Sequence, residues 1–148
     1  MSSGKTNRCV GKNNLPKFAF IVRGVPGSGK STTSKHLAGE NGVIHAVDDL
    51  HKDASGNFLW NEALEEELYR KNFELFKASC KSGVSVVVCD NINVTRNEYQ
   101  KYVDCALEND YVTSVVTLSK PTPSLAALRN KHSVTLEQIK DMYERWED

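Results

Sequence analysis

The chain has 148 residues, a length that suits one domain built around one hydrophobic core. Its 19 lysines and arginines balance its 19 aspartates and glutamates, so the whole chain exerts no long-range attraction on a nucleic-acid backbone, although a local basic groove is compatible with this balance. No apolar run reaches the length of a membrane span, and the N-terminus lacks the apolar core of a signal peptide, which argues against a membrane protein.

The first predicted unit is a strand, a loop and a helix that follow a polar N-terminal segment. Residues 1–16 are polar and aperiodic, and we expect them to form a flexible tail ahead of a domain that spans 17–148. An apolar run of strand type at 18–22 leads into Gly-Val-Pro-Gly-Ser-Gly-Lys-Ser at 24–31, and residues 31–38 can open a helix. This is the complete G-x-x-x-x-G-K-[ST] pattern in the strand–loop–helix context in which it binds phosphate.

The residue types of this loop suit a nucleoside triphosphate. Glycines let the backbone approach an anion without a Cβ clash, and successive N–H groups then face the phosphates. Lys30 would reach the β- and γ-phosphates, and the Ser31 hydroxyl would bind Mg²⁺. The sequence therefore predicts that ATP or GTP, with Mg²⁺, binds to Gly24, Val25, Pro26, Gly27, Ser28, Gly29, Lys30, Ser31 and Thr32.

Three more apolar runs, at 43–47, 84–89 and 112–118, alternate with helical patterns. This alternation is typical of a parallel sheet with crossover helices. The run at 84–89 is rich in valine, as expected of a strand that is buried on both faces. We therefore predict an α/β P-loop NTPase fold, with a single parallel sheet of four or five strands flanked by helices.

The helical patterns carry recognisable start and stop signals. One helix is expected over Asn61–Ser82, where Gly83 stops it, and two later helices open with capping-box sequences at 95–98 and 135–138. The apolar stripes predict the following core positions in these helices: Leu64, Leu68, Phe76 and Cys80; Tyr99, Tyr102, Val103, Ala106 and Leu107; and Leu136, Ile139, Tyr143 and Trp146.

The four cysteines lack the C-x-x-C spacing of a zinc or redox site. Cys9 falls in the polar tail, whereas Cys80, Cys89 and Cys105 fall in a predicted helix, strand and helix, where a free thiol packs as a small apolar group. This usage favours a reduced, intracellular protein, with the cytoplasm as the expected compartment.

Polar clusters follow the first three predicted strands. The phosphate loop follows the first, Asp48-Asp49 the second, and Asp90-Asn91-Ile92-Asn93 the third, so all three clusters are expected at one edge of the sheet. Asp48 is the candidate general base for an acceptor hydroxyl, and Asp90 is the candidate support for hydrated Mg²⁺. The alternative roles are a helix cap for the Asp48-Asp49 pair and a turn-forming residue for Asp90.

A basic stretch, Arg129-Asn-Lys-His132, lies between the fourth predicted strand and the last helix. In small P-loop kinases a mobile lid occupies this place, and its cations close over the donor phosphates. A solvated turn is an equally good interpretation of the stretch by itself.

Taken together, these motifs resemble the polynucleotide-kinase branch of P-loop phosphotransferases. The matching segments are Arg23–Thr32, Val47–Asp49, Val87–Asn93, Leu128–Val134 and Ile139–Trp146, so the resemblance covers 18–147. It implies that Asp48 is the general base and that Arg129 is a lid arginine of a kinase-type domain. The candidate residues for binding the acceptor substrate are Asp49, His51, Asn91 and Asn93.

This sequence departs from the phage-type members of that branch at three positions. His51 stands where an arginine would hold the phosphate of the acceptor, Lys131 or His132 stands for a second lid arginine, and Ile92 replaces a threonine. The Asp-Asn-x-Asn and Arg-Asn-Lys-His motifs agree better with the kinase-like domains of the ubiquitin-ligase-binding branch.

Three functions follow as expectations. The leading one is an ATP-dependent kinase that phosphorylates the 5′-hydroxyl of an RNA or DNA end. The first alternative is a P-loop kinase for a nucleoside, sugar or antibiotic, which the zero net charge and His51 favour. The second is a nucleotide-binding interaction module that has lost transfer activity, which the altered lid supports and intact Lys30, Asp48 and Asp90 oppose.

Overall fold

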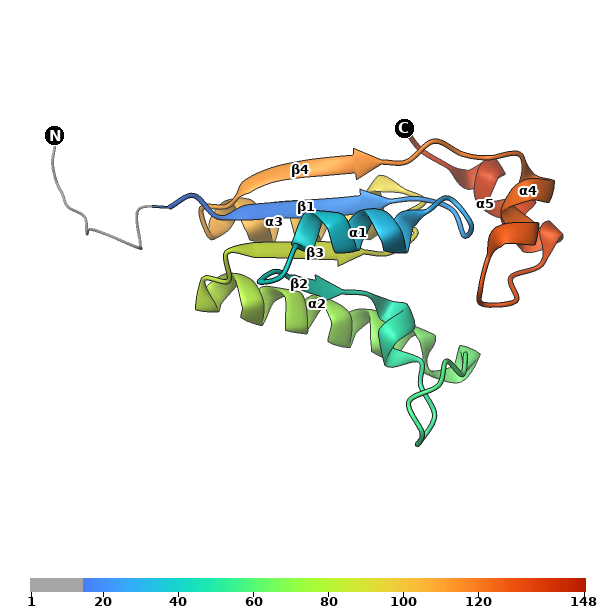
Figure 1. Ribbon diagram of the computed structural model, residues 1–148, viewed down its shortest axis with the longest axis horizontal. Coiled ribbons are helices and arrows are strands. Elements are labelled where there is room, and N and C mark those ends of the chain that lie inside the picture. Colours follow the sequence, from blue (N-terminus) through green and yellow to red (C-terminus); the bar gives the residue numbers. More distant parts are fainter. Residues whose placement is uncertain (1–14) are drawn as a thin grey trace, which may run out of the picture.

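The computed structural model describes residues 15–148. Its four strands form one parallel sheet in the order β2-β3-β1-β4 (Figure 1). The strands are β1 (Phe18–Arg23), β2 (Val43–His45), β3 (Val86–Asp90) and β4 (Val112–Thr117). The predicted α/β class and parallel sheet are confirmed. Most of the expected tail, residues 1–14, lies outside the described residues.

Helices cover both faces of the sheet and extend beyond one end of it. They are α1 (Lys30–Ala38), α2 (Glu65–Ser82), α3 (Arg96–Glu108), α4 (Pro123–Arg129) and α5 (Leu136–Arg145), with 3-10 turns η2 (Val47–Leu50) and η3 (Glu62–Leu64). Helix α1 packs on one face, and α2 and α3 pack side by side on the other. Helices α4 and α5 lie past the carboxyl ends of the strands, on the right in Figure 1.

The two faces of the central strands bury different clusters. Ala19 and Ile21 of β1 pack with aromatic residues of α2 and α3, such as Phe76 and Tyr102. The alternate residue Val22 packs with Val88 and Ala38 under α1. Because side chains alternate along a strand, this pattern buries β1 and β3 on both faces, as the valine run predicted.

Several predicted boundaries are wrong by one to four residues, and local hydrogen bonds explain those of β2 and α2. Strand β2 stops at His45, since Asp49 N–H bonds Ala46 O and turns the chain into η2. Helix α2 begins at Glu65 rather than Asn61, because the Asn61 side chain caps the separate turn η3 at Ala63 N. Strand β3 runs through Asp90, which is therefore its last residue.

The helix signals had mixed outcomes. The capping box at Thr135 and Gln138 is present, whereas Thr95 makes no capping bond, because its hydroxyl donates to Glu98 instead. Helix α4 was not predicted, although the Thr122 side chain caps it and a proline opens it. Three predicted core positions, Leu64, Leu107 and Leu136, are exposed, and Trp146 lies just past the end of α5.

Candidate active site

The phosphate loop leaves β1 and is held in shape by left-handed glycines. Gly27 has φ +85° and Gly29 has φ +93°, a region that L side chains rarely adopt. A Cβ atom on Gly27 would also meet Ala126 O of α4 at 2.5 Å. Glycine is therefore required at position 27 for two reasons, the loop conformation and the close approach of helix α4.

Several polar groups of the loop have no partner within 15–148. Helix α1 receives no side-chain cap and has no acidic residue in its first turn. The first backbone bond of the helix runs from Thr33 N–H to Gly29 O. The N–H groups of Lys30, Ser31 and Thr32 come before it and have no carbonyl partner within the helix. The buried Ser28 Oγ also lacks a hydrogen-bond partner. Orphaned donors at a helix N-terminus fit a bound phosphate chain.

Lys30 and Asp90 form a buried ion pair at the head of this loop. Lys30 Nζ lies 3.0 Å from Asp90 Oδ1, and the two side chains are only 14% and 8% exposed. Asp90 is paired in register with Val22, so the sheet itself sets its position beside the loop. The pair keeps both charges compensated in a poorly solvated place, where a lone charge would be costly.

The arrangement suits Mg²⁺ that is bound together with a nucleotide. Among residues 15–148, no group of three His, Cys, Asp or Glu side chains is arranged to hold a metal ion. Mg²⁺ usually takes one or two protein oxygens and fills its other positions with water and phosphate oxygens. Ser31 and Asp90 would supply those protein oxygens, while the phosphates would supply the rest.

The two acidic residues after β2 differ in their surroundings. Asp48 lies in η2 with its Oδ2 3.4 Å from His132 Nε2, and these side chains are 47% and 38% exposed. The Asp49 side chain is exposed, and its Oδ1 lies 4.0 Å from Lys52 Nζ. Asp48 is therefore the carboxylate that contacts the lid segment, and Asp49 is not part of that contact.

The other candidate acceptor residues have their polar atoms bonded inside the protein. His51 is buried, with Nε2 2.7 Å from Glu65 Oε1 and with Nδ1 accepting from Asn61 N. Asn91 Oδ1 accepts from Val47 N, which ties η2 to the end of β3. Asn93, at φ +55°, donates to Val22 O. These side chains build the framework around Asp48 and do not line an open surface beside it.

Arg129 ends α4 and is exposed, and it makes no ion pair with any residue from 15 to 148. The turn after it is built on Asn130, whose Oδ1 accepts from His132 N and Val134 N. Helices α4 and α5 rest on the phosphate loop, because Ala126 and Ile139 form a buried cluster with Val25. The candidate lid segment, 129–132, thus begins at the end of a helix that is anchored on the loop, and its Arg129 is exposed.

Sequence reasoning missed the role of Arg23, the residue just before the loop. It is 1% exposed and lies between the rings of Tyr99 and Trp146, at 4.6 and 4.5 Å from their centroids. Its guanidinium donates to Asn93 O, Val94 O and Glu147 O. The sequence signal that could have revealed this role is an arginine at the end of an otherwise apolar strand. In the structure, Arg23 joins the phosphate loop, the end of β3 and the C-terminal segment.

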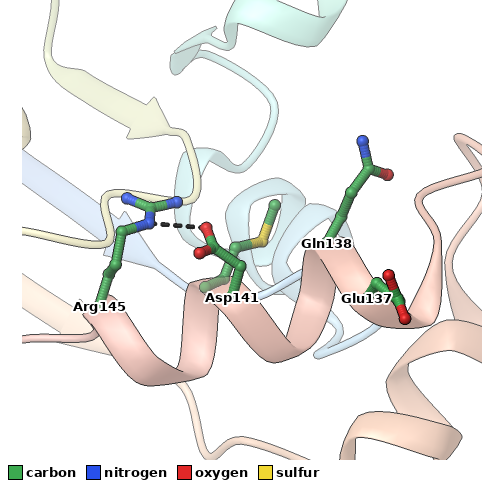
Figure 2. A pocket seen from close by; sticks show the side chains of 5 residues that line it. Glu137, Gln138, Asp141 and Arg145 are labelled. Carbon is green, nitrogen blue, oxygen red and sulfur yellow. Dashed lines mark hydrogen bonds and ion pairs between the residues drawn. The ribbon is translucent and has the colours of Figure 1, made fainter.

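The described thiols and the surface hollow on α5 lie outside this site. Burial raises the pKa of Cys80 and of Cys89 to about 12, so both remain protonated, consistent with the predicted structural role. Figure 2 shows the hollow, which one face of α5 lines with Glu137, Gln138, Asp141, Met142 and Arg145. Arg145 Nε donates to Asp141 within that helix. The hollow shares no residue with the phosphate loop or with Asp48.

Residues 20–147 match the family model of an AAA domain, AAA_33. The chain belongs to this family. Human NEDD4-binding protein 2 is 30% identical to this AAA_33 domain over 132 residues, which are 86% of this chain and 7% of that protein. The chain therefore spans less than a tenth of the length of this relative. The predicted family resemblance is confirmed.

Solved structures similar to this AAA_33 domain have the fold of P-loop kinases. A chain of the Pnkp1/Rnl/Hen1 RNA repair complex has a TM-score of 0.64 and 22% identity, covering 92% of this chain and 46% of that one. A Janibacter sugar kinase has a TM-score of 0.59 and 20% identity, covering 90% and 79%. At these identities the likeness shows the fold, and a P-loop fold of this kind binds nucleotides. Among the helices described, none has the length and apolar character needed to cross a bilayer.

Proposed function

We propose that this AAA_33 domain is an ATP-dependent phosphotransferase that acts on the 5′-hydroxyl of an RNA or DNA end. The observation that carries the proposal is the placement of the half-exposed Asp48 carboxylate at the same sheet edge as the buried Lys30–Asp90 pair. A kinase needs the donor phosphates clamped and the acceptor hydroxyl relieved of its proton, and these groups suit those two tasks.

The residues divide the reaction between them. The loop amides and Lys30 hold the β- and γ-phosphates, and Mg²⁺, held through Ser31 and Asp90, would neutralise charge on their oxygens. The acceptor oxygen bonds to the γ-phosphorus as the bond from that phosphorus to the β–γ bridging oxygen breaks. The hydroxyl proton passes to Asp48, and ADP leaves. Arg129 moves toward the bridging oxygen, where its charge acts mainly in the transition state.

The choice of a polynucleotide acceptor rests on family-level support. A structural neighbour is part of an RNA repair complex, and the motifs of this chain as a set resemble the wider polynucleotide-kinase branch, although two of them agree best with its ubiquitin-ligase-binding members. A small hydroxyl-bearing acceptor is the second candidate. The sugar kinase neighbour favours it, and so does the burial of His51, which leaves no exposed cation three residues after Asp48.

The buried free thiols support a proposal for the cellular compartment in which the domain works. Cys80, Cys89 and Cys105 are reduced and buried. Proteins of reducing compartments typically keep their cysteines in this state. We infer that the domain works inside the cell, in the cytoplasm.

A transfer assay with γ-labelled ATP tests the function. The domain is incubated with Mg-ATP and a panel of 5′-hydroxyl oligonucleotides, nucleosides and sugars, with Asp48→Asn as the inactive control. We expect label on the 5′-hydroxyl oligonucleotides at the highest rate. Faster labelling of a nucleoside or sugar would move the function to the second candidate. No labelling above the Asp48→Asn level would leave a nucleotide-binding module.

A further inference from the structure

A short hairpin lies beside Asp48 and presents aromatic side chains. Lys52 and Phe58 pair across it, and Leu59 N–H bonds His51 O at 2.8 Å. Its tip is fixed by Asp53, whose Oδ1 accepts from Ser55 N and Asn57 N, each at 2.9 Å. This dense set of backbone bonds holds the hairpin in one conformation. The rings that it carries are therefore presented in a defined orientation.

His132 of the lid segment contacts both this hairpin and the candidate base. Its ring lies against the Phe58 ring in a tilted arrangement, with 4.1 Å between the ring centroids and 36° between the planes. The same ring places Nε2 3.4 Å from Asp48 Oδ2. A planar nitrogen heterocycle thus lies against an aromatic ring, with one nitrogen 3.4 Å from the carboxylate of the candidate base.

We propose that Phe58 and Asp48 form the subsite for the first nucleoside of the acceptor, and that His132 fills this subsite when no acceptor is bound. The inference rests on the proposed function and names the group that its acceptor presents. The base of the terminal nucleoside stacks on Phe58, and its 5′-hydroxyl reaches Asp48. Aromatic faces stack bases of any identity, which suits an enzyme that acts on ends of varied sequence.

The contact that His132 makes is suited to replacement. The His132 and Asp48 side chains are both more than a third exposed, so water and salt screen their attraction. A nucleobase offers Phe58 a larger stacking surface than an imidazole does. Acceptor binding therefore displaces His132, and since Arg129 lies in the same segment, the displacement frees Arg129 to approach the donor phosphates.

The hairpin carries a second aromatic ring at its end. Trp60 is half exposed, and its ring centroid lies 6.4 Å from that of His51, which in turn lies 6.2 Å from that of Phe58. Its indole N–H donates to Glu65 Oε1, which fixes the ring. The Phe58 ring near the Asp48 carboxylate, with the exposed Trp60 ring on the same hairpin, suits a planar acceptor better than a sugar.

A pair of oligonucleotides tests the subsite without relying on catalysis. Each is short, has a free 5′-hydroxyl and carries fluorescein at its 3′ end, and one bears adenine at the 5′ residue whereas the other is abasic there. We expect fluorescence anisotropy to show about tenfold tighter binding of the adenine-bearing form, the scale of one stacked base. Equal binding of the two forms, or no binding of either, would overturn the proposal.

Hairpin variants assign the preference to Phe58. Phe58→Ala and the apolar, larger Phe58→Leu should both remove the difference between the two oligonucleotides, because neither keeps an aromatic face. Leu59→Ala, an exposed neighbour on the same hairpin, is the matched control and should keep the difference. A preference that survives in Phe58→Leu, with Mg-ATP affinity and thermal melting intact, would contradict the assignment.

His132→Ala tests whether this residue competes with the acceptor. We expect it to bind the adenine-bearing oligonucleotide more tightly than the parent does, because the competing ring is gone. Weaker binding would mean that His132 contacts the acceptor instead, and would overturn that part of the proposal. The transfer assay separates the two proposals: base preference without transfer supports the subsite alone, whereas transfer without base preference supports the function alone.

Discussion

Arg23 and Arg129 are the same residue type in opposite situations. Arg23 is buried between two aromatic rings, and its N–H groups donate to three backbone carbonyls. Arg129 is exposed at the end of α4 and has no ionic partner in the described part of the chain. A buried side chain that is bonded to three carbonyls is structural, whereas an exposed one at the edge of the candidate site is available for another state.

The Lys30–Asp90 ion pair and the Asp48–His132 contact show the same contrast. The Lys30–Asp90 and Asp48–His132 distances are similar, at 3.0 and 3.4 Å, but the first pair is almost buried and the second is more than a third exposed. Charges attract far more strongly where water is excluded. The phosphate-loop side is therefore held by a buried ion pair, while the proposed acceptor side and the 129–132 segment are held by an exposed contact that a substrate can replace.

The largest effect is expected from Lys30→Ala, which acts directly on the phosphate-loop side. The variant should lose measurable Mg-ATP binding, because Lys30 is the positive charge of the loop and its removal leaves Asp90 buried without its partner. Calorimetry with Mg-ATP measures this. Lys35→Ala, an exposed lysine later in α1, is the control and should bind as the parent does. Parent-like affinity of Lys30→Ala would make the phosphate-loop assignment wrong.

Arg23→Ala tests whether the buried arginine is structural. We expect the free energy of unfolding to fall by about 3 kcal/mol, since charged hydrogen bonds and two ring contacts are lost together. Urea unfolding gives the value, and Arg23→Lys should lie between the variant and the parent because lysine lacks the planar fork. The exposed Arg96 provides the control Arg96→Ala. A loss as small as that of Arg96→Ala would end the contrast with Arg129.

Asp48→Asn tests the acceptor side. The fold and the Mg-ATP affinity should be unchanged, because Asp48 is half exposed and its contact with His132 is screened. Phosphoryl transfer should fall by about 10²-fold or more, the usual scale of general base catalysis. The comparison is made on the best acceptor of the panel. If turnover stays at the parent level, the base lies elsewhere, with Asp49 as the next residue to test.

Arg129→Ala sharpens the comparison with Arg23. The variant should have the same free energy of unfolding as the parent, and its kcat should be lower by about tenfold or more. The loss should be smaller than the 10³- to 10⁵-fold of a dedicated arginine finger, because Lys131 and His132 lie nearby and can supply part of the charge. Steady-state kinetics over a range of Mg-ATP concentrations separates kcat from affinity, with Lys140→Ala on α5 as the control. A loss confined to nucleotide affinity would leave 129–132 as a solvated turn.

The smallest expected effect compares two helix starts that look alike in sequence. Thr135→Ala should lower the free energy of unfolding by about 1 kcal/mol, because its side chain caps α5. Thr95→Ala should cost less, since Thr95 accepts no backbone N–H at the start of α3. Urea unfolding of both variants decides between them, and equal losses would mean that the two starts are equivalent in solution.

Features that depend on neighbouring residues could be predicted from the sequence. Three such features are the strand–loop–helix with its glycines, the valine-rich central strand and the cap at Thr135. Each depends on only a few consecutive residues, because backbone conformation and side-chain alternation act over that range. The approach of Asp48 and Asp90 to one sheet edge followed from the rule that ligands gather at the carboxyl ends of parallel strands. Helix α4 was missed because its seven residues carry too short a periodic pattern.

The sequence by itself thus determined the fold class, the phosphate loop and the candidate base. The tertiary structure decided what each polar residue near that loop is free to do. His51, Asn91 and Asn93 looked like acceptor contacts but are bonded inside the framework, while Phe58 and His132 meet only because two distant segments fold together. Burial and partner choice are set by segments far apart in the chain, and no local pattern records them.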